Sequence, residues 1–110
     1  MSDTQVYKKL QGFEFFRSLS PLELQEVASH CEVLHIKSNH VLFSESSLID
    51  AVFLILYGSF KIQQKTQAKE PVIFNFLSRG DFLGVAMAGV RNAVYPASAV
   101  ANEESAVFKF

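Results

Sequence analysis

From Cys31 onward, the hydrophobic residues of this chain alternate with a period of about two, in short runs separated by turn residues. Before Cys31 their spacing is closer to that of a helix. Successive side chains of a strand point to opposite faces, so this alternation indicates half-buried strands. Many short strands at even spacing are typical of a β-sandwich or a jelly roll. The expected fold is mainly β, an antiparallel jelly roll with short N-terminal helices.

The clearest strand signals lie in the middle of the chain. Residues 51–57 form an apolar run that predicts a buried strand, and Gly58 marks a bend before a strand over 59–65. Residues 66–70 predict a polar hairpin tip, followed by a return strand over 71–77. Shorter strands are expected over 31–37 and 40–44, and a last antiparallel pair over 97–102 and 105–110.

Two helices are expected ahead of the strands. The first covers 6–11 and is closed by Gly12. The second begins at Ser20, which can cap the helix with Glu23 as its capping-box partner, while Pro21 suits the first helical position. Its apolar stripe is expected to contain Leu22, Leu24, Val27 and Ala28. The aromatic residues Phe13, Phe15 and Phe16 are expected to avoid solvent.

Composition restricts the class of protein. A chain of 110 residues with 49% hydrophobic residues is long enough for one domain with one core. Its formal net charge of −1 supplies no basic stripe for nucleic acid. The run over 51–57 is far too short to span a membrane, and no signal peptide is visible. With Cys31 as its one cysteine, the chain is expected to be soluble and cytoplasmic.

Catalytic and metal-binding patterns are weak. His30, His35 and His40 could be metal ligands or ordinary surface and packing residues, and their spacing of five places neighbours on opposite faces of a strand. One cysteine is too few for an iron–sulfur cluster. Nucleophile elbows and phosphate-binding loops of known type are absent from the sequence. We therefore expect no metal site and no enzymatic activity.

The strongest candidate for a ligand site is a segment rich in small residues. Residues 80–89, which include Gly84, Val85 and Ala86, indicate a strand end, a tight turn and one helical turn. Residues 95–101, which include Ala97, Ser98 and Ala99, indicate a strand that begins immediately after Pro96. Exposed main-chain N–H groups in such a segment can bind an anion, and small side chains let a ligand approach closely. A plain turn between two strands is the alternative interpretation.

The ordered motifs resemble cyclic-nucleotide-binding domains over nearly the whole chain. The helical lead-in at 16–28, central strands at 41–45 and 53–62, Gly80-Asp81-Phe82-Leu83-Gly84 and Ser98-Ala99-Val100 carry the resemblance. It is nearest to the sensor half of bacterial transcription regulators of the catabolite-activator and fumarate-nitrate-regulator (Crp/Fnr) type. The resemblance implies one domain over residues 1–110, with a helical lead-in at 1–30 and a jelly roll at 31–110. The dimerisation helix and helix-turn-helix of such regulators do not follow here. The strand-like ending over 107–110 suggests a fragment of a longer protein, and a natural short protein is the alternative.

The resemblance also implies a set of ligand-binding positions. In the family a glutamate after the cassette glycine holds the ribose, and an arginine before the Ser-Ala pair binds the cyclic phosphate. This chain has Val85 and Ala97 there. Other cassette positions match the family pattern or complete the cassette: Gly84, Ala86, Ser98 and Ala99. The residues expected to line the cavity are Phe43, Ile62 and Phe74. Arg91 is a candidate substitute for the phosphate contact, and Ser46 stands where the family has a turn glycine.

These differences favour a sensor with a degenerate cassette. Losing two charge-assisted hydrogen bonds, at roughly 1.5–3 kcal/mol each, weakens binding by on the order of 10² to 10⁴-fold. We therefore expect a ligand-sensing regulatory domain that binds cyclic AMP weakly or not at all. No cofactor is required, and a cyclic nucleotide or another small anion is the candidate effector. DNA contact is expected only through a domain outside this chain, and any homodimer through an exposed strand edge. The alternative is a stand-alone protein-interaction module.

Overall fold

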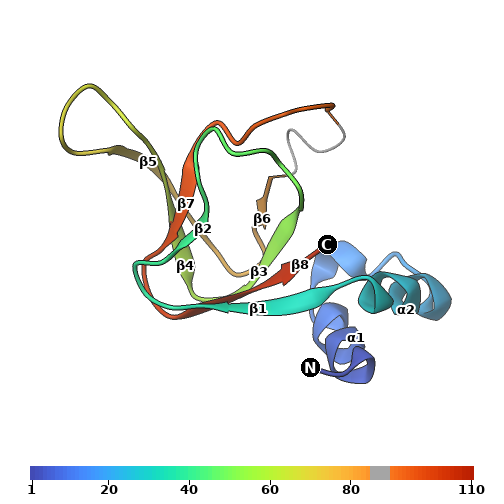
Figure 1. The fold of residues 1–110 in the computed structure, drawn as a ribbon. Coiled ribbons are helices and arrows are strands. Elements are labelled where there is room, and N and C mark those ends of the chain that lie inside the picture. The colour runs from blue at the N-terminus through green and yellow to red at the C-terminus, as the bar shows by residue number, and fades with distance from the viewer. Residues whose placement is uncertain (85–89) are drawn as a thin grey trace.

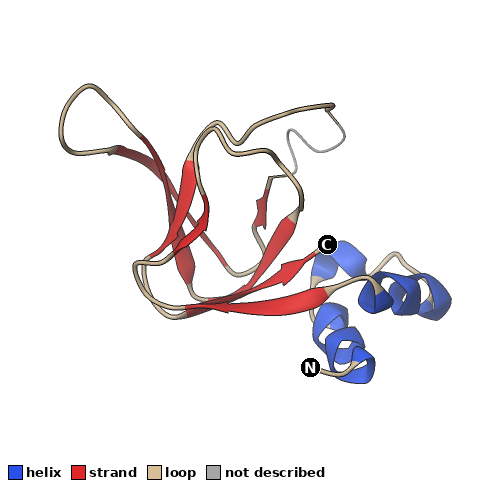
Figure 2. Ribbon diagram, in the orientation of Figure 1, coloured by secondary structure: helices blue, strands red, loops and turns tan. Residues whose placement is uncertain are grey.

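The computed structural model describes residues 1–84 and 90–110. In this part of the chain, eight strands form two four-stranded antiparallel sheets, and the helices lie together beside one end of the roll (Figures 1 and 2). The predicted fold class, mainly β with short N-terminal helices, is confirmed. Within these ranges, none of the helices has the length and apolar character needed to cross a membrane.

Each sheet combines strands from distant parts of the sequence. The first has the order β1-β8-β3-β6, and its strands are Glu32–Ile36, Ser105–Lys109, Phe53–Tyr57 and Phe82–Leu83. The second has the order β2-β7-β4-β5, and its strands are Val41–Phe43, Ser98–Ala101, Ser59–Gln64 and Val72–Ser78. The predicted hairpin between residues 59–65 and 71–77 is present as β4 and β5. Both strands of this hairpin belong to the second sheet, and β5 forms its edge.

The predicted pairing of the last two strands is wrong. Strand β7 pairs with β2 and β4, whereas β8 pairs with β1 and β3 in the other sheet. The turn between them therefore carries the chain from one sheet to the other. Asn102 begins this turn and donates its N–H to the Ser59 carbonyl at 2.9 Å. A short turn looks the same in sequence whether it joins paired strands or changes sheets.

Both α-helices begin with a capping box. In α2 (Pro21–Ser29) the Ser20 N–H donates to Glu23 Oε1 at 2.9 Å and the Glu23 N–H donates to Ser20 Oγ at 3.2 Å, as predicted. Helix α1 (Asp3–Gln11) starts three residues earlier than predicted because Ser2 and Gln5 form the same motif. A short 3₁₀ turn, η1 (Glu14–Phe16), connects the two helices.

Two residues that were expected to be buried face solvent instead. Leu22 is 78% exposed, because it lies about 200° around α2 from Leu24, which is buried with Ala28. Phe15 is 68% exposed, because successive residues of a 3₁₀ turn lie about 120° apart and its neighbour Phe16 takes the buried direction. The buried stripe of α2 is therefore narrower than its apolar content suggests.

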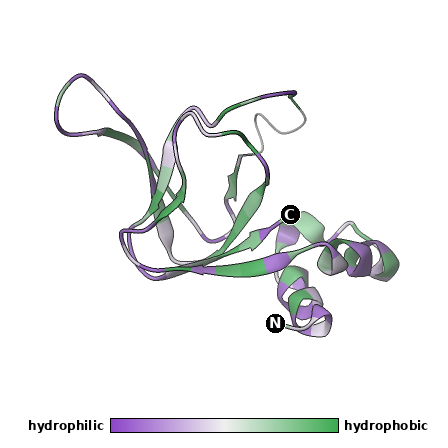
Figure 3. Cartoon of the chain, in the orientation of Figure 1, coloured by the Kyte–Doolittle hydropathy of each residue, from purple (hydrophilic) through white to green (hydrophobic). Residues whose placement is uncertain are grey.

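The central strands β3 and β8 are buried on both faces. Leu54 and Phe108, which are cross-strand partners, pack under the helices, while their neighbours Ile55 and Val107 pack between the sheets. This burial on both sides explains why β3 is a continuous apolar run rather than an alternating one. Figure 3 shows hydrophobic residues in green along the central strands and on parts of the helices.

Gly58 lets β3 turn directly into β4. Its φ of +86° is a left-handed backbone conformation that residues with a side chain rarely adopt. A Cβ at this position would overlap the Ser105 side chain. Ser105 Oγ accepts a hydrogen bond from the Ser59 N–H at 3.1 Å, which ties the bend to the start of β8. The bend predicted from this glycine is confirmed.

Candidate functional site

Two loops lie side by side at the open end of the roll. The Ser46 N–H donates to the Tyr95 carbonyl at 2.8 Å, the Tyr95 N–H donates to the Ser47 carbonyl at 2.9 Å, and the Ile49 N–H donates to the Ala93 carbonyl at 2.9 Å. Ser46 has a φ of 71°, so the serine keeps a left-handed turn where the resembled family has glycine. The loop after β2 thus holds the approach to β7 in place.

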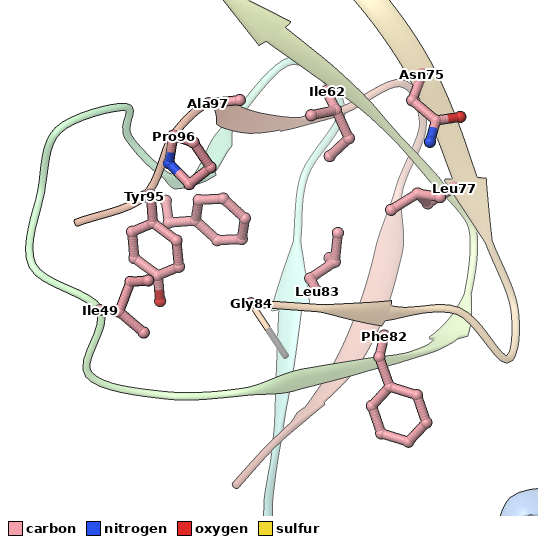
Figure 4. A pocket seen from close by; sticks show the side chains of 11 residues that line it. Ile49, Ile62, Asn75, Leu77, Phe82, Leu83, Gly84, Tyr95, Pro96 and Ala97 are labelled. Atoms are coloured by element: carbon pink, nitrogen blue, oxygen red, sulfur yellow. The ribbon is translucent and has the colours of Figure 1, made fainter. Parts of the chain in front are cut away.

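A cavity of about 190 Å³ lies between these loops, the β4–β5 hairpin and β6 (Figure 4). Four of the predicted site residues line it: Phe43, Ile62, Gly84 and Ala97. Seven further residues line it. Phe82, Leu83, Tyr95 and Pro96 lie in the two segments that the sequence singled out, whereas Ile49, Asn75 and Leu77 were not foreseen. Four of the predicted residues therefore share one cavity, and their role in ligand binding stays a prediction.

Phe74 does not line the cavity. Its side chain is 55% exposed, and its neighbour Asn75 pairs with Ile62 and lines the cavity instead. The pairing of β4 with β5 shifts register between Ile62 and Gln63, and the sequence gives no sign of this irregularity. Since Phe60 pairs with Leu77, the inward face of β4 could have identified Asn75 and Leu77 once the register was known.

An aromatic stack forms one wall of the cavity. The rings of Phe43 and Tyr95 are 3.9 Å apart between centroids and 12° from parallel. The Tyr95 hydroxyl donates to the Ala51 carbonyl at 3.2 Å, and burial raises the pKa of this phenol, with a smaller contribution from the nearby Asp50 charge. Gly84 has a φ of +87°, and a Cβ there would lie 3.2 Å from the same carbonyl oxygen. The glycine therefore lets the chain at the end of β6 approach the Ala51 carbonyl closely.

Ser98 and Ala99 lie next to the cavity without lining it. Ser98 Oγ accepts the Glu45 N–H at 2.8 Å, and Glu45 Oε1 accepts the Lys65 N–H at 2.9 Å. Ala99 is fully buried between the two sheets. Both residues therefore have structural contacts that account for their positions. Val85 and Ala86, the remaining predicted site residues, lie outside the described residues.

Charge is the property that this cavity lacks. None of the described residues that line it is Asp, Glu, Lys, Arg or His. Arg91, the candidate phosphate ligand, is exposed and does not line the cavity. The apolar lining of the cavity suits an uncharged molecule better than a cyclic phosphate.

The cysteine and the histidines lie away from the cavity. Burial raises the pKa of the Cys31 thiol to about 12, with a smaller contribution from the Glu32 carboxylate. His30 Nε2 lies 3.1 Å from Glu26 Oε1, and His35 Nδ1 lies 3.2 Å from the Tyr57 hydroxyl. Residues 1–84 and 90–110 contain no group of three or more His, Cys, Asp or Glu side chains that could hold a metal ion.

Comparison with known proteins gives a family match and several similar folds. The family model for the cyclic nucleotide-binding domain matches residues 33–110. No curated protein matches the sequence. The sensor domain of the transcriptional regulator DNR from Pseudomonas aeruginosa is 23% identical, with a TM-score of 0.83, and the alignment covers 98% of this chain and 72% of that domain.

Two further solved structures have the same fold. A cyclic nucleotide-binding-like protein from Brucella abortus is 24% identical with a TM-score of 0.77, covering 96% of this chain and 90% of that one. The regulatory domain of Toxoplasma gondii PKA, solved with cAMP, is 15% identical with a TM-score of 0.83, covering 98% of this chain and 41% of that one. At these identities the likeness establishes the fold alone.

Proposed function

The chain belongs to the cyclic nucleotide-binding domain family, and on that premise we propose that it is the ligand-sensing domain of a Crp/Fnr-type transcription regulator. The observation that carries this proposal is the cavity at the open end of the roll, lined by the cassette residues Gly84 and Ala97. A small molecule bound there would contact both sheets and the two paired loops, and binding could thereby alter the shape of the domain.

We further propose that cyclic AMP and cyclic GMP are not tight ligands. Ala97 and Val85 stand where the resembled family has an arginine and a glutamate, and neither can form a charge-assisted hydrogen bond. The exposed position of Arg91 offers no replacement among the described lining residues. A cyclic phosphate would therefore lose its hydration at this site without gaining a cationic partner.

Isothermal titration calorimetry with cyclic AMP and cyclic GMP tests the ligand part of this proposal. We expect no heat of binding at ligand concentrations up to about 100 µM, since the two missing contacts weaken binding by on the order of 10² to 10⁴-fold. Low-micromolar binding of either nucleotide would contradict it. Such a result would leave the sensing role intact and would change the identity of the effector.

The same proposal includes three broader expectations. The domain is not an enzyme, it acts in the cytoplasm, and any DNA contact is made by a different domain. The raised pKa of Cys31 supports the first, because a protonated thiol is a poor nucleophile. The net charge of −1 supports the last. Hydrolysis assays with cyclic nucleotides and a DNA mobility-shift assay would test the first and the last, and fractionation of cells that produce the protein would test the second.

A protein-interaction module is the second candidate function, and the surface of β5 favours it. This edge strand exposes Val72, Ile73, Phe74 and Phe76 and contains no charged residue. Such an edge can pair with an extended strand from a protein partner. If the partner strand comes from a second copy of the chain, light scattering should give the mass of a dimer for the wild type and of a monomer for Phe76→Lys. The gene beyond Phe110 also separates the candidates, because a helix-turn-helix there favours the sensor.

A further inference from the structure

The lining of the cavity is concave and largely apolar. Phe43, Ile49, Ile62 and Leu77 are each only half-buried although they are hydrophobic, and they face a common space. Figure 4 shows Ile49 and Tyr95 on one side of this space and Ile62 and Leu77 on the other. Apolar surface left partly open to water in a concave site favours a ligand that covers it.

Among the described residues, no cationic side chain lines the cavity to pair with an anion. Lys61 precedes the lining residue Ile62 on β4, so the alternation of the strand directs it to the other face. By sequence, residues 85–89 contain no ionisable side chain. An anionic ligand would therefore lose water without a charged partner, whereas a neutral ligand would not carry that cost.

Two polar groups remain to orient a neutral ligand. Asn75 Oδ1 accepts the Phe76 N–H at 2.9 Å, and the Asn75 NH₂ group donates to none of the described residues, so it can donate to a ligand. The Tyr95 oxygen can accept a hydrogen bond in addition to the one that its hydroxyl donates to Ala51. A ligand hydroxyl could satisfy either partner, whereas a ligand carbonyl could accept only from the Asn75 NH₂ group.

Size and shape narrow the ligand class further. The cavity of about 190 Å³ is below the range of roughly 300–1,000 Å³ usual for drug-sized ligands. It is slightly larger than an engineered apolar cavity of about 150 Å³ that binds benzene. The near-parallel rings of Phe43 and Tyr95 form an aromatic wall against which a flat ring can pack.

We infer that the cavity takes an uncharged planar molecule of one or two rings carrying a single polar substituent. The inference rests on the proposed sensing function and assigns its effector to a chemical class distinct from the cyclic nucleotides. The flat face of the ligand lies against the Phe43–Tyr95 wall. A ligand carbonyl accepts from the Asn75 NH₂ group, and a ligand hydroxyl meets Asn75 or Tyr95. Ile62 and Leu77 close the opposite side.

A matched pair of probes tests this inference. 2-Naphthol and 2-naphthyl phosphate share one ring system and differ in the anionic group, and the chain has no tryptophan to interfere with naphthalene fluorescence. Titrations of the whole chain should show saturable binding of 2-naphthol and at least about tenfold weaker binding of the phosphate. Cyclic AMP and cyclic GMP are titrated under the same conditions.

Variants of two adjacent residues locate the binding. Leu77→Phe narrows the cavity and should weaken 2-naphthol binding about tenfold, while Phe76→Leu changes the opposite face of β5 and should leave binding unchanged. Ile62→Phe narrows the cavity from β4 and serves if Leu77→Phe does not fold, which thermal melting reports. If 2-naphthol binds the wild type, Leu77→Phe and Ile62→Phe equally tightly, its binding site is not this cavity.

The remaining outcomes separate the two proposals. Binding of 2-naphthyl phosphate or of a cyclic nucleotide as tight as that of 2-naphthol overturns the ligand class and leaves the sensing function standing. Failure of all four molecules to bind a protein with a normal melting transition overturns this inference and counts against small-molecule sensing itself.

Discussion

The two faces of the central strands β3 and β8 are covered in different ways. On one face Leu54 and Phe108 are fully buried under the helices, in a cluster that extends through Leu10 of α1 and Leu24 of α2. On the other face Ile55 and Val107 are equally buried, but the cluster extends toward half-buried side chains around a cavity. One side of the same strands is therefore closed by the chain itself, and the other leaves space for a ligand.

The difference follows from what covers each face. The helix side is covered by two capped helices and by Phe13 in the segment between them, whose ring meets Phe108 edge to face at 6.0 Å. Arg79 adds its guanidinium over the Phe13 ring at 4.3 Å and donates to the Leu56 carbonyl at 2.7 Å. The cavity side is covered by loops and by small residues such as Gly84 and Ala97, which cannot fill it.

The largest effect is expected from emptying the helix side. Phe108→Ala should lower the free energy of unfolding by about 3–5 kcal/mol, since it removes a fully buried ring and leaves a cavity. Urea denaturation monitored by circular dichroism measures the change. The matched control Phe76→Ala removes a ring that is 63% exposed and should change stability by no more than about 0.5 kcal/mol. Similar losses for both variants would contradict the burial of Phe108 on the helix side.

On the cavity side, a charge should change the ligand preference. Ala97→Arg adds a cation at the edge of the cavity and should strengthen binding of 2-naphthyl phosphate about 10- to 100-fold, because one charge-assisted hydrogen bond contributes roughly 1.5–3 kcal/mol. Fluorescence titration measures the dissociation constants. Ala97→Gln, which adds length and a donor without charge, should not produce this gain. An equal gain for both variants would show that charge is not the missing property.

A smaller effect is expected from removing the cap of α2. Ser20→Ala should lower the free energy of unfolding by about 1 kcal/mol, because it removes the acceptor for the Glu23 N–H on the helix side. Thermal unfolding measures the shift. Ser18→Ala, an exposed serine two residues earlier, is the control and should have little effect. Unchanged ligand binding in Ser20→Ala would confirm that the two faces respond separately.

The smallest effect concerns Cys31, which packs against the helix-side cluster. Burial raises the pKa of this thiol to about 12 from an ordinary value near 9, so the unfolded chain loses the proton first as pH rises. Stability should therefore decline between about pH 9 and pH 12, and this part of the decline should vanish in Cys31→Ala. Alkylation by iodoacetamide at pH 9 should be slower in the native protein than in urea. Equal rates would place the thiol in a more exposed setting.

Local signals were sufficient for much of the fold. Ser20, Pro21 and Glu23 predicted α2 because capping depends on neighbours within one turn. Gly58 predicted the bend after β3, and the polar tip at residues 66–70 predicted the β4–β5 hairpin. Each of these features is determined by a few consecutive residues.

Several of the errors involve contacts between distant residues. The strands β7 and β8 were expected to pair, and Phe74 was expected in the cavity in place of Asn75. Tyr95 lies in the segment that the sequence singled out, but its place in the cavity wall depends on its stack against Phe43 of β2. None of these outcomes is encoded in the segment itself, because each depends on which strand lies alongside and in which register.

The sequence by itself determined that this chain forms short strands behind capped helices and that its cassette lacks the arginine and glutamate of the resembled family. Periodicity, caps and single residues such as Ala97 decide these points locally. Only the tertiary structure decided which side chains share the cavity and that this cavity is bounded by Phe43, Tyr95, Ile62 and Leu77. The physical reason is that a cavity is the space left between separately specified elements, and its lining depends on their register and packing together.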